Sequence, residues 1–474
     1  MLADALAETS RARGTARLWH LLRALRARNY RLYVAGQSVS LLGTWMQRLA
    51  LSWWVYQHTH SALALGLVGG VGQLPALLLA PLAGALVDRW DRQRLLVVTQ
   101  LAPLCGRRAS SPFLAMLQSF GLAWLVLAGR ATLWHVLLCS VLLGLINAVD
   151  MPARQALVGE LVEQPADLNN ALALNASITN GARLIGPALA GLVIMRLGEG
   201  ICFLLNGLSY LALLAAVRAM RLPPHPTAPG ATASAQGEAL PRAPLLAEAH
   251  AGVRYAWGFT PVRAILLLLT VANLLGMPYQ VLMPMFAMDM LHGDAHTLAR
   301  LTAASGVGAI LGALYLASRD SVVGFGRVLV LSTGLFGLGL VGLSYARHEG
   351  AAWLTLIAAS GGMMVLSTTS NTALQTIVEE EKRGRILSLY SMVFMGTAPV
   401  GSLVAGIVAT HLTAPRMVRI GGLCCLVGAL VFARHLPALR AMVRPRSAHR
   451  EILQDTTGRE PTAMEVSLHA HHEH

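Results

Sequence analysis

Residues 49–87 read LALSWWVYQHTHSALALGLVGGVGQLPALLLAPLAGALV, and this stretch contains no Asp, Glu, Lys or Arg. Residues 350–378 and 386–415 are equally free of these charged residues. A hydrocarbon core about 30 Å thick needs ~20 apolar residues per helix, so the first run has room for nearly two spans. In lipid the backbone must satisfy its own hydrogen bonds, which only helices and closed barrels achieve. Barrel strands alternate apolar with polar residues, whereas these runs are apolar on all sides, so we predict membrane-spanning helices.

The composition argues against a soluble enzyme. Of the 474 residues, 55% are hydrophobic and 13% are charged, whereas roughly 25% are charged in a typical soluble domain. The net charge of +14 comes from basic residues at the ends of alternate apolar runs rather than in one aromatic-interleaved patch, so we expect no nucleic-acid partner. H-E-x-x-H, G-x-S-x-G and Walker phosphate-loop patterns do not occur in the sequence, and its five cysteines lack zinc-site spacing. We therefore predict no catalytic, cofactor-binding or metal site.

Long apolar runs separated by short charged segments predict an all-α integral membrane protein with twelve transmembrane helices. We expect these helices near 32–56, 62–87, 95–128, 132–149, 168–195, 201–218, 262–288, 298–318, 327–346, 352–371, 385–411 and 416–433. Basic residues concentrate in alternate loops, and the positive-inside rule then places both termini in the cytoplasm. That orientation requires an even number of spans. Ten and fourteen remain open as alternatives, and twelve fits best.

A change in composition divides the chain. Residues 219–254 are rich in Pro, Ala, Gly, Thr and Ser, which predicts a flexible cytoplasmic linker. The sequence GPALAGLV at 186–193 is similar to GSLVAGIV at 401–408, so the halves on either side look related. Duplicated halves that rock around a central site are a transporter design. The predicted parts are a basic cytoplasmic N-terminus (1–31), two pseudo-symmetric six-helix bundles (32–218 and 255–433), the linker between them and a cytoplasmic tail (434–474).

The sequence GALVDRWDRQR falls between the second and third predicted helices. It resembles the loop signature of the major facilitator superfamily and departs from that pattern at Asp91, where Gly is usual. A small residue lets helix ends approach, and an acid with adjacent arginines can pair across neighbouring helices in one conformation and release in the other. We interpret this as a cytoplasmic gate, with an ordinary positive-inside turn as the alternative. The gate motif comprises Gly84, Asp88, Arg89, Arg92 and Arg94.

The fifth predicted helix resembles the antiporter motif of superfamily exporters, in which glycines allow close helix contact and proline bends the axis. The eleventh helix has a similar pattern of glycines around a proline. Small residues are, however, also common wherever transmembrane helices pack. The residues are Gly181, Gly186, Pro187 and Gly191 in the fifth helix, and Gly396, Pro399, Gly401 and Gly406 in the eleventh.

Residues 28–59 and 147–191 resemble the superfamily branch that contains the bacterial enterobactin exporter and its macrolide-efflux relatives. This resemblance implies export of a bulky amphiphilic small molecule, a siderophore or a drug, by alternating access and driven by the proton gradient. It also implies a working monomer in the bacterial inner membrane. An importer or lipid flippase of the same fold, and a non-transporting sensor or scaffold, remain alternatives.

Polar groups inside spans are costly and are therefore functional candidates. Arg48 is the foremost, either as a cation facing the cavity or as a residue that snorkels or pairs structurally. A proton-coupled exporter also needs a carboxylate, yet the predicted helices contain no mid-span acid. Asp150 and Asp289, at helix ends, are the possible proton-linked acids. The cavity candidates are Gln37, Arg48, Asn147, Arg183, Asn273 and Gln280.

Residues 103–115 interrupt the third predicted helix with Arg107, Arg108 and Pro112. Without these residues, 95–102 and 116–128 would form one uninterrupted span. Two arginines at bilayer depth cost several kcal/mol. We therefore predict that the segment is an insertion, either an extra loop or a sequence anomaly, that bulges out or breaks the helix.

Overall fold

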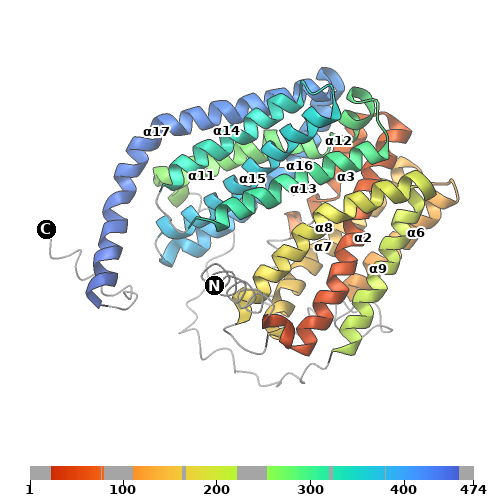
Figure 1. The fold of residues 1–474 in the computed structure, drawn as a ribbon, viewed down its shortest axis with the longest axis horizontal. Coiled ribbons are helices and arrows are strands. Elements are labelled where there is room, and N and C mark those ends of the chain that lie inside the picture. The colour runs from red at the N-terminus through yellow and green to blue at the C-terminus, as the bar shows by residue number, and fades with distance from the viewer. Residues whose placement is uncertain are drawn as a thin grey trace, which may run out of the picture. The chain divides into compact units, whose positions relative to one another are not determined.

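The computed structural model describes residues 23–75, 77–79, 110–162, 167–220, 254–319, 324–378 and 380–457, and this part of the chain forms helices and no strands (Figure 1). The chain divides into two compact units. The first contains Met1–Pro241 and Val281–Gly306, and the second contains Arg242–Gln280 and Val307–His474.

In the first unit, α2 packs against α8 and α9, and α6 packs against α7 and α9. Its turns are compact. Ser61 caps α3 by accepting a hydrogen bond from the Ala64 N–H, and Gly129 between α6 and α7 has a φ of +65° that favours glycine. The elements are η1 (Arg23–Arg26), α2 (Arg28–Thr59), α3 (Ala62–Val71), α6 (Ser110–Leu127), α7 (Leu133–Leu161), α8 (Leu168–Leu197), α9 (Glu199–Ala219), α12 (Met283–Met285), η5 (Phe286–Met290) and the first part of α13 (Ala295–Ala317).

A buried amide network lies where α2, α6 and α9 meet. The Asn206 amide donates to Gln47 Oε1 at 2.7 Å and to Ser119 Oγ at 3.1 Å. The Gln47 amide donates to Gln118 Oε1 at 3.3 Å. Hydrogen bonds between membrane helices contribute about 0.6–2 kcal/mol each, so this network links the three helices without any net charge.

In the second unit, α14 packs against α15 and α17. Small residues set this spacing, because a Cβ on Gly337 would lie 2.8 Å from the Gly422 carbonyl oxygen. The elements are α11 (Thr260–Val271), η3 (Ala272–Gly276), η4 (Met277–Gln280), the rest of α13, α14 (Phe325–Leu343), α15 (Glu349–Ile377), α16 (Glu380–Leu412) and α17 (Ala414–Thr457).

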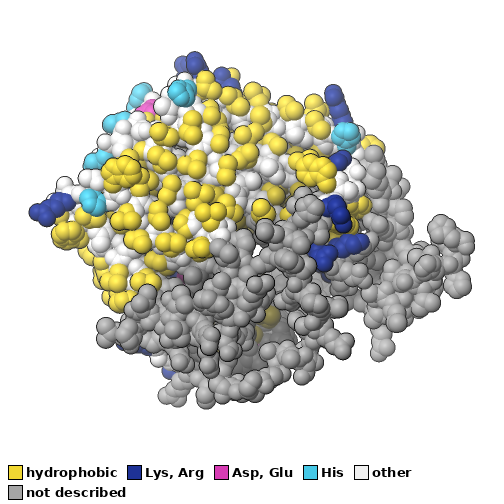
Figure 2. All heavy atoms as spheres, turned by 180° about the vertical axis from the view of Figure 1, so that it is seen from behind, with side chains coloured by type: hydrophobic (Ala, Val, Ile, Leu, Met, Phe, Trp, Pro, Cys, Tyr) yellow, Lys and Arg dark blue, Asp and Glu magenta, His cyan; other side chains and the backbone are white. Residues whose placement is uncertain are grey.

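Eight helices of the described residues are long and apolar enough to cross a membrane. Three shorter apolar helices lie at Ala62–Val71, Ser111–Leu127 and Leu133–Ala148. Each predicted range overlaps a helix of the described residues, but the total of twelve spans stays a prediction. Figure 2 shows a face on which hydrophobic side chains predominate and charged ones lie chiefly at its margins. Exposed residues such as Trp134, Leu331 and Leu354 suit contact with lipid.

Two sequence-based expectations about helices are wrong. The fourth predicted helix continues past residue 149 to Leu161 as α7. The seventh is not one regular helix, because α11 passes into π and 3₁₀ turns where Pro278 and Pro284 lack the N–H that a regular helix needs.

Residues 110–115, the last part of the predicted insertion, lie within α6, and the prediction that the insertion bulges out or breaks the third helix stays a prediction. Ala115 packs with Met116 and Tyr210. Residues 103–109, with Arg107 and Arg108, lie outside the described residues.

Candidate functional site

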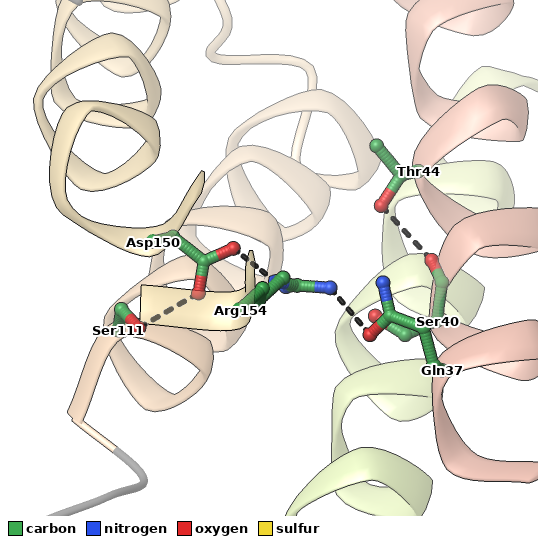
Figure 3. Close-up of polar contacts among 6 residues, drawn as sticks. All are labelled: Gln37, Ser40, Thr44, Ser111, Asp150 and Arg154. Atoms are coloured by element: carbon green, nitrogen blue, oxygen red, sulfur yellow. Dashed lines mark hydrogen bonds and ion pairs between the residues drawn. The ribbon is translucent and has the colours of Figure 1, made fainter. Parts of the chain in front are cut away.

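A buried carboxylate and a guanidinium form the centre of the candidate site (Figure 3). Asp150 on α7 is only 7% exposed. Arg154, one turn further along α7, donates from Nε to the Asp150 carboxylate and from Nη1 to Gln37 Oε1 on α2. Ser111 at the start of α6 donates to Asp150 Oδ1 at 2.8 Å. One ion pair therefore links three helices.

The i,i+4 spacing of Asp150 and Arg154 places both side chains on one face of α7. Gln37 is buried as well, and Tyr33 lies one turn before it with 2% exposure. Removing one member of a buried ion pair costs about 3–5 kcal/mol, because the other charge is left unpaired. Loss of the Asp150 charge would therefore disturb α2 and α6 together with α7.

The side chain of Thr44 in this region is satisfied within its own helix. Thr44 Oγ1 donates to the Ser40 carbonyl oxygen at 2.9 Å (Figure 3). Among the residues drawn, the hydrogen bond from Arg154 to Gln37 is therefore the link between α7 and α2.

Arg48 and Arg183 meet at the ring of Trp45. The guanidinium carbon of Arg48 lies 4.9 Å from the ring centroid, and that of Arg183, on α8, lies 5.7 Å from it. Both distances are within the range of a cation–π interaction. Arg48 is exposed although Gln47 and Leu49 on either side are buried.

The fifth-helix motif explains how α8 comes so close to α2. A Cβ on Gly186 would lie 2.6 Å from Trp45 Cβ, and one on Gly191 would lie 2.4 Å from Ala299 Cβ, so both glycines permit tight contacts. A Cβ on Gly181 would meet nothing within 4 Å. Pro187 lies inside α8. Gly186 and Gly191 of the motif therefore lie at tight helix contacts, whereas Gly181 does not.

Asp289 lies at the end of η5 and is exposed. It accepts a hydrogen bond from the hydroxyl of Tyr56, which is buried near the end of α2. The structure thus keeps Asp289 at a helix end, as predicted, whereas Asp150 lies well inside α7. The expectation that Asp150 stands at a helix end is wrong, because the helix continues beyond it.

The remaining candidates have local roles in the structure. Asn147 is half-buried on α7. The Asn273 amide donates to the Leu269 carbonyl of its own helix at 3.0 Å. The Gln280 amide donates to the Tyr279 hydroxyl at 3.4 Å, and that hydroxyl pairs with Ser360 Oγ at 2.9 Å.

The eleventh-helix counterpart lies on α16, with Pro399 inside the helix. A Cβ on Gly401 would lie 2.8 Å from the Leu274 carbonyl oxygen, so this glycine brings α16 against η3. Gly406 is buried and Gly396 is half-buried. The cytoplasmic gate motif, Gly84, Asp88, Arg89, Arg92 and Arg94, lies outside the described residues.

Sequence reasoning missed Arg154 and Ser111. Arg154 was expected in a cytoplasmic loop, yet its spacing from Asp150 was a usable signal, because opposite charges four residues apart support a helix. Ser111 had no such signal. Within the described ranges, no group of three or more His, Cys, Asp and Glu side chains could hold a metal ion.

Known transporters are similar to this chain over most of its length. The staphyloferrin A transporter of Staphylococcus aureus is 26% identical over 397 residues, covering 82% of this chain and 92% of the relative. The multidrug efflux pump Tap of Mycolicibacterium fortuitum is 26% identical over 371 residues, covering 76% and 83%. The crystal structure of the nucleoside transporter NupG has the same fold, with a TM-score of 0.62 at 14% identity over 84% of this chain and 99% of that one.

The family described as transmembrane secretion effector matches residues 21–461. This match covers nearly the whole chain, including α7 with its ion pair and the motif-bearing helices α8 and α16. The predicted resemblance is confirmed: the chain belongs to the transmembrane secretion effector family of major facilitator superfamily transporters.

Proposed function

We propose that this chain is a secondary active exporter that moves a bulky amphiphilic small molecule, a siderophore or a drug, in exchange for protons. Two relatives support export of this kind of cargo, since one is named a staphyloferrin A transporter and the other a multidrug efflux pump. The Asp150–Arg154 pair carries the proton link, because it supplies the buried carboxylate that such a mechanism needs.

The chemistry of the link follows from its hydrogen bonds. While Asp150 is ionised, it holds the Arg154 guanidinium, whose other end holds Gln37. A proton on the carboxylate removes the charge that Arg154 pairs with, so the restraint between α7 and α2 weakens. Proton binding can in this way favour one arrangement of the helices over another, which is what coupling requires.

The proposal retains the predictions made for the whole chain. The bundles at 32–218 and 255–433 alternate access to a central site, and Gly84, Asp88, Arg89, Arg92 and Arg94 form the cytoplasmic gate. The protein works as a monomer in the bacterial inner membrane, with both termini in the cytoplasm and the proton gradient as the energy source.

Transport in everted membrane vesicles tests the proposal. The panel is a catecholate siderophore, a macrolide and a fluorescent cationic dye, each with and without a proton gradient. Wild type is expected to accumulate at least one compound in a gradient-dependent way. Uptake by right-side-out vesicles alone would indicate an importer, and no movement of any compound would favour a sensor or scaffold.

Two acid variants locate the proton link. Asp150→Asn is expected to abolish gradient-driven accumulation while exchange of cargo down its own gradient continues. Asp289→Asn makes the same change at the other possible proton-linked acid, which is exposed, and it should accumulate cargo as wild type does if the coupled proton binds at Asp150. Since Asp150→Asn leaves Arg154 unpaired, the double variant Asp150→Asn/Arg154→Gln checks folding, and it should recover thermal stability without recovering coupling. Normal accumulation by Asp150→Asn would place the proton link elsewhere.

A further inference from the structure

Two arginines from different helices converge on one aromatic ring in the first unit. Arg48 of α2 and Arg183 of α8 lie 4.9 and 5.7 Å from the Trp45 ring centroid, so the separation of their guanidinium carbons cannot exceed the sum of these distances. Like charges repel at such range unless an anion lies between or beside them. Bringing the two guanidinium groups together therefore costs electrostatic free energy, which another interaction must offset.

Among the described residues, the ion pairs Arg23–Asp167 and Arg154–Asp150 involve neither guanidinium. The Trp45 ring offsets only part of the charge, about 0.5–2 kcal/mol for each cation–π contact. Contact of Arg48 with hydrocarbon would cost several kcal/mol. Its exposed side chain is thus suited to an aqueous surface and an anion from outside the chain.

Close packing of α8 on α2 brings the two arginines together. Gly186, one turn after Arg183, lets α8 approach so closely that an added Cβ would lie 2.6 Å from Trp45 Cβ and 3.1 Å from the Leu42 carbonyl oxygen. Any larger residue at this position would move Arg183 away from the ring. The arginine pair is consequently a product of helix packing, and side-chain flexibility alone does not account for it.

We infer that Arg48, Arg183 and Trp45 form the cargo-binding element for an organic anion that carries carboxylate groups. This inference rests on the proposed export function and names its substrate class. Each guanidinium can hold a carboxylate through two parallel hydrogen bonds, a geometry that Lys and amide side chains cannot reproduce. The indole ring provides a flat apolar surface beside them, which suits the non-polar part of an amphiphilic cargo.

Binding to the purified full-length protein is measured first, because it does not depend on transport. The probes are citrate and its neutral triethyl ester at constant ionic strength, read by thermal shift and by tryptophan fluorescence. Citrate is expected to stabilise wild type and the triethyl ester is not. Arg48→Gln and Arg183→Gln should each weaken citrate binding by about 10- to 100-fold, since each removes charge-assisted hydrogen bonds.

Arg196→Gln is the matched control, because it removes the same charge from an exposed position on the same helix and should bind citrate normally. Arg183→Lys keeps the positive charge but loses the two parallel hydrogen bonds that a guanidinium donates to a carboxylate. We therefore expect an intermediate loss of citrate affinity. Arg183→Glu separates binding from folding. It places a carboxylate near Arg48 and should raise the apparent Tm of the ligand-free protein while abolishing citrate binding.

Lipid phosphate is the other possible source of the anion. Binding is therefore repeated in nanodiscs of pure phosphatidylcholine and of phosphatidylcholine with phosphatidylglycerol. Citrate binding that is unchanged by phosphatidylglycerol supports the inference. Loss of citrate binding in the anionic nanodiscs, or equal binding by wild type and Arg48→Gln, would overturn it.

Transport measurements distinguish a failure of the anion-binding inference from a failure of the proposed export function. If the vesicles accumulate the cationic dye or the macrolide and the Arg48→Gln/Arg183→Gln variant does so at least as well, export stands and the arginines serve anionic cargo. If the double variant loses every cargo equally, the arginines have a general role and the inference fails. No accumulation by wild type would overturn the proposed function, while the citrate measurement would still decide the anion site.

Discussion

At the scale of single residues, Asp294 gives a pH-dependent test of stability. It precedes α13 and accepts a hydrogen bond from the Thr297 N–H at 3.0 Å, as an N-cap residue does. Partial burial raises the pKa of the Asp294 carboxyl, but hydrogen bonds from backbone N–H groups and the nearby His296 outweigh it, so the pKa is lowered from its ordinary value. The folded state therefore favours the carboxylate, whose stabilising effect is present above the unfolded pKa and is lost as pH falls through the folded pKa.

Asp294→Ala should destabilise the protein by about 1 kcal/mol at neutral pH. Asp294→Asn keeps the capping oxygen without titrating, so it is the matched control. The apparent Tm in detergent is measured from pH 7 to pH 3. The gap between wild type and Asp294→Ala should narrow below about pH 4, and wild type should fall relative to Asp294→Asn. A gap that stays constant to pH 3 would show that the capping charge adds nothing.

The candidate site shows what residue-level reading could and could not find. Gln37, Arg48, Arg183, Asp150 and Asp289 were predicted because each is a costly polar group near an apolar run. Their grouping was not predictable, since Gln37 contacts the Asp150–Arg154 pair only through the packing of α2 on α7. The error in the helix end had the same cause. The apolar run stops before Asp150, but an ion pair within the helix satisfies both charges and α7 continues.

At the scale of elements, replacing two glycines of α8 by alanine is expected to have opposite effects on stability. Gly186→Ala forces a Cβ against Trp45 and the α2 backbone and should cost about 1–3 kcal/mol through overpacking. Gly181→Ala meets nothing within 4 Å and should stabilise α8 by up to about 1 kcal/mol through helix propensity. Apparent Tm values of the two variants give the comparison. Equal destabilisation by both would contradict tight packing of α2 on α8 at Gly186.

The elements also show the limits of pattern reading. Charge-free runs located helices well because a membrane imposes both helical structure and length. Irregularities were less visible, although Pro278 and Pro284 were available as signals for the break after α11. The entry of residues 110–115 into α6 had no such signal, because their contacts with α7 and α9 come from other parts of the chain.

At the scale of the whole molecule, the sequence predicted the family more firmly than the cargo. The helical architecture and the transporter family follow from long apolar runs and from motifs that are local in sequence, and the match over residues 21–461 confirms the family. Cargo recognition depends on side chains that meet only after folding. Arg48 and Arg183 approach Trp45 from two helices, so their shared role could be inferred only from the structure.

The predicted orientation in the membrane has a direct test with single cysteines in a cysteine-free background. Arg130, between α6 and α7, is exposed and was expected outside, whereas Ser318, after α13, is exposed and was expected in the cytoplasm. Arg130→Cys should react with a membrane-impermeant maleimide in intact cells, and Ser318→Cys should react only after permeabilisation. This outcome requires an odd number of crossings through α7, α8, α9, residues 260–290 and α13, as the twelve-helix topology demands. Reaction of both cysteines from the same side would mean that one of these elements does not span, and two six-helix bundles would then be untenable.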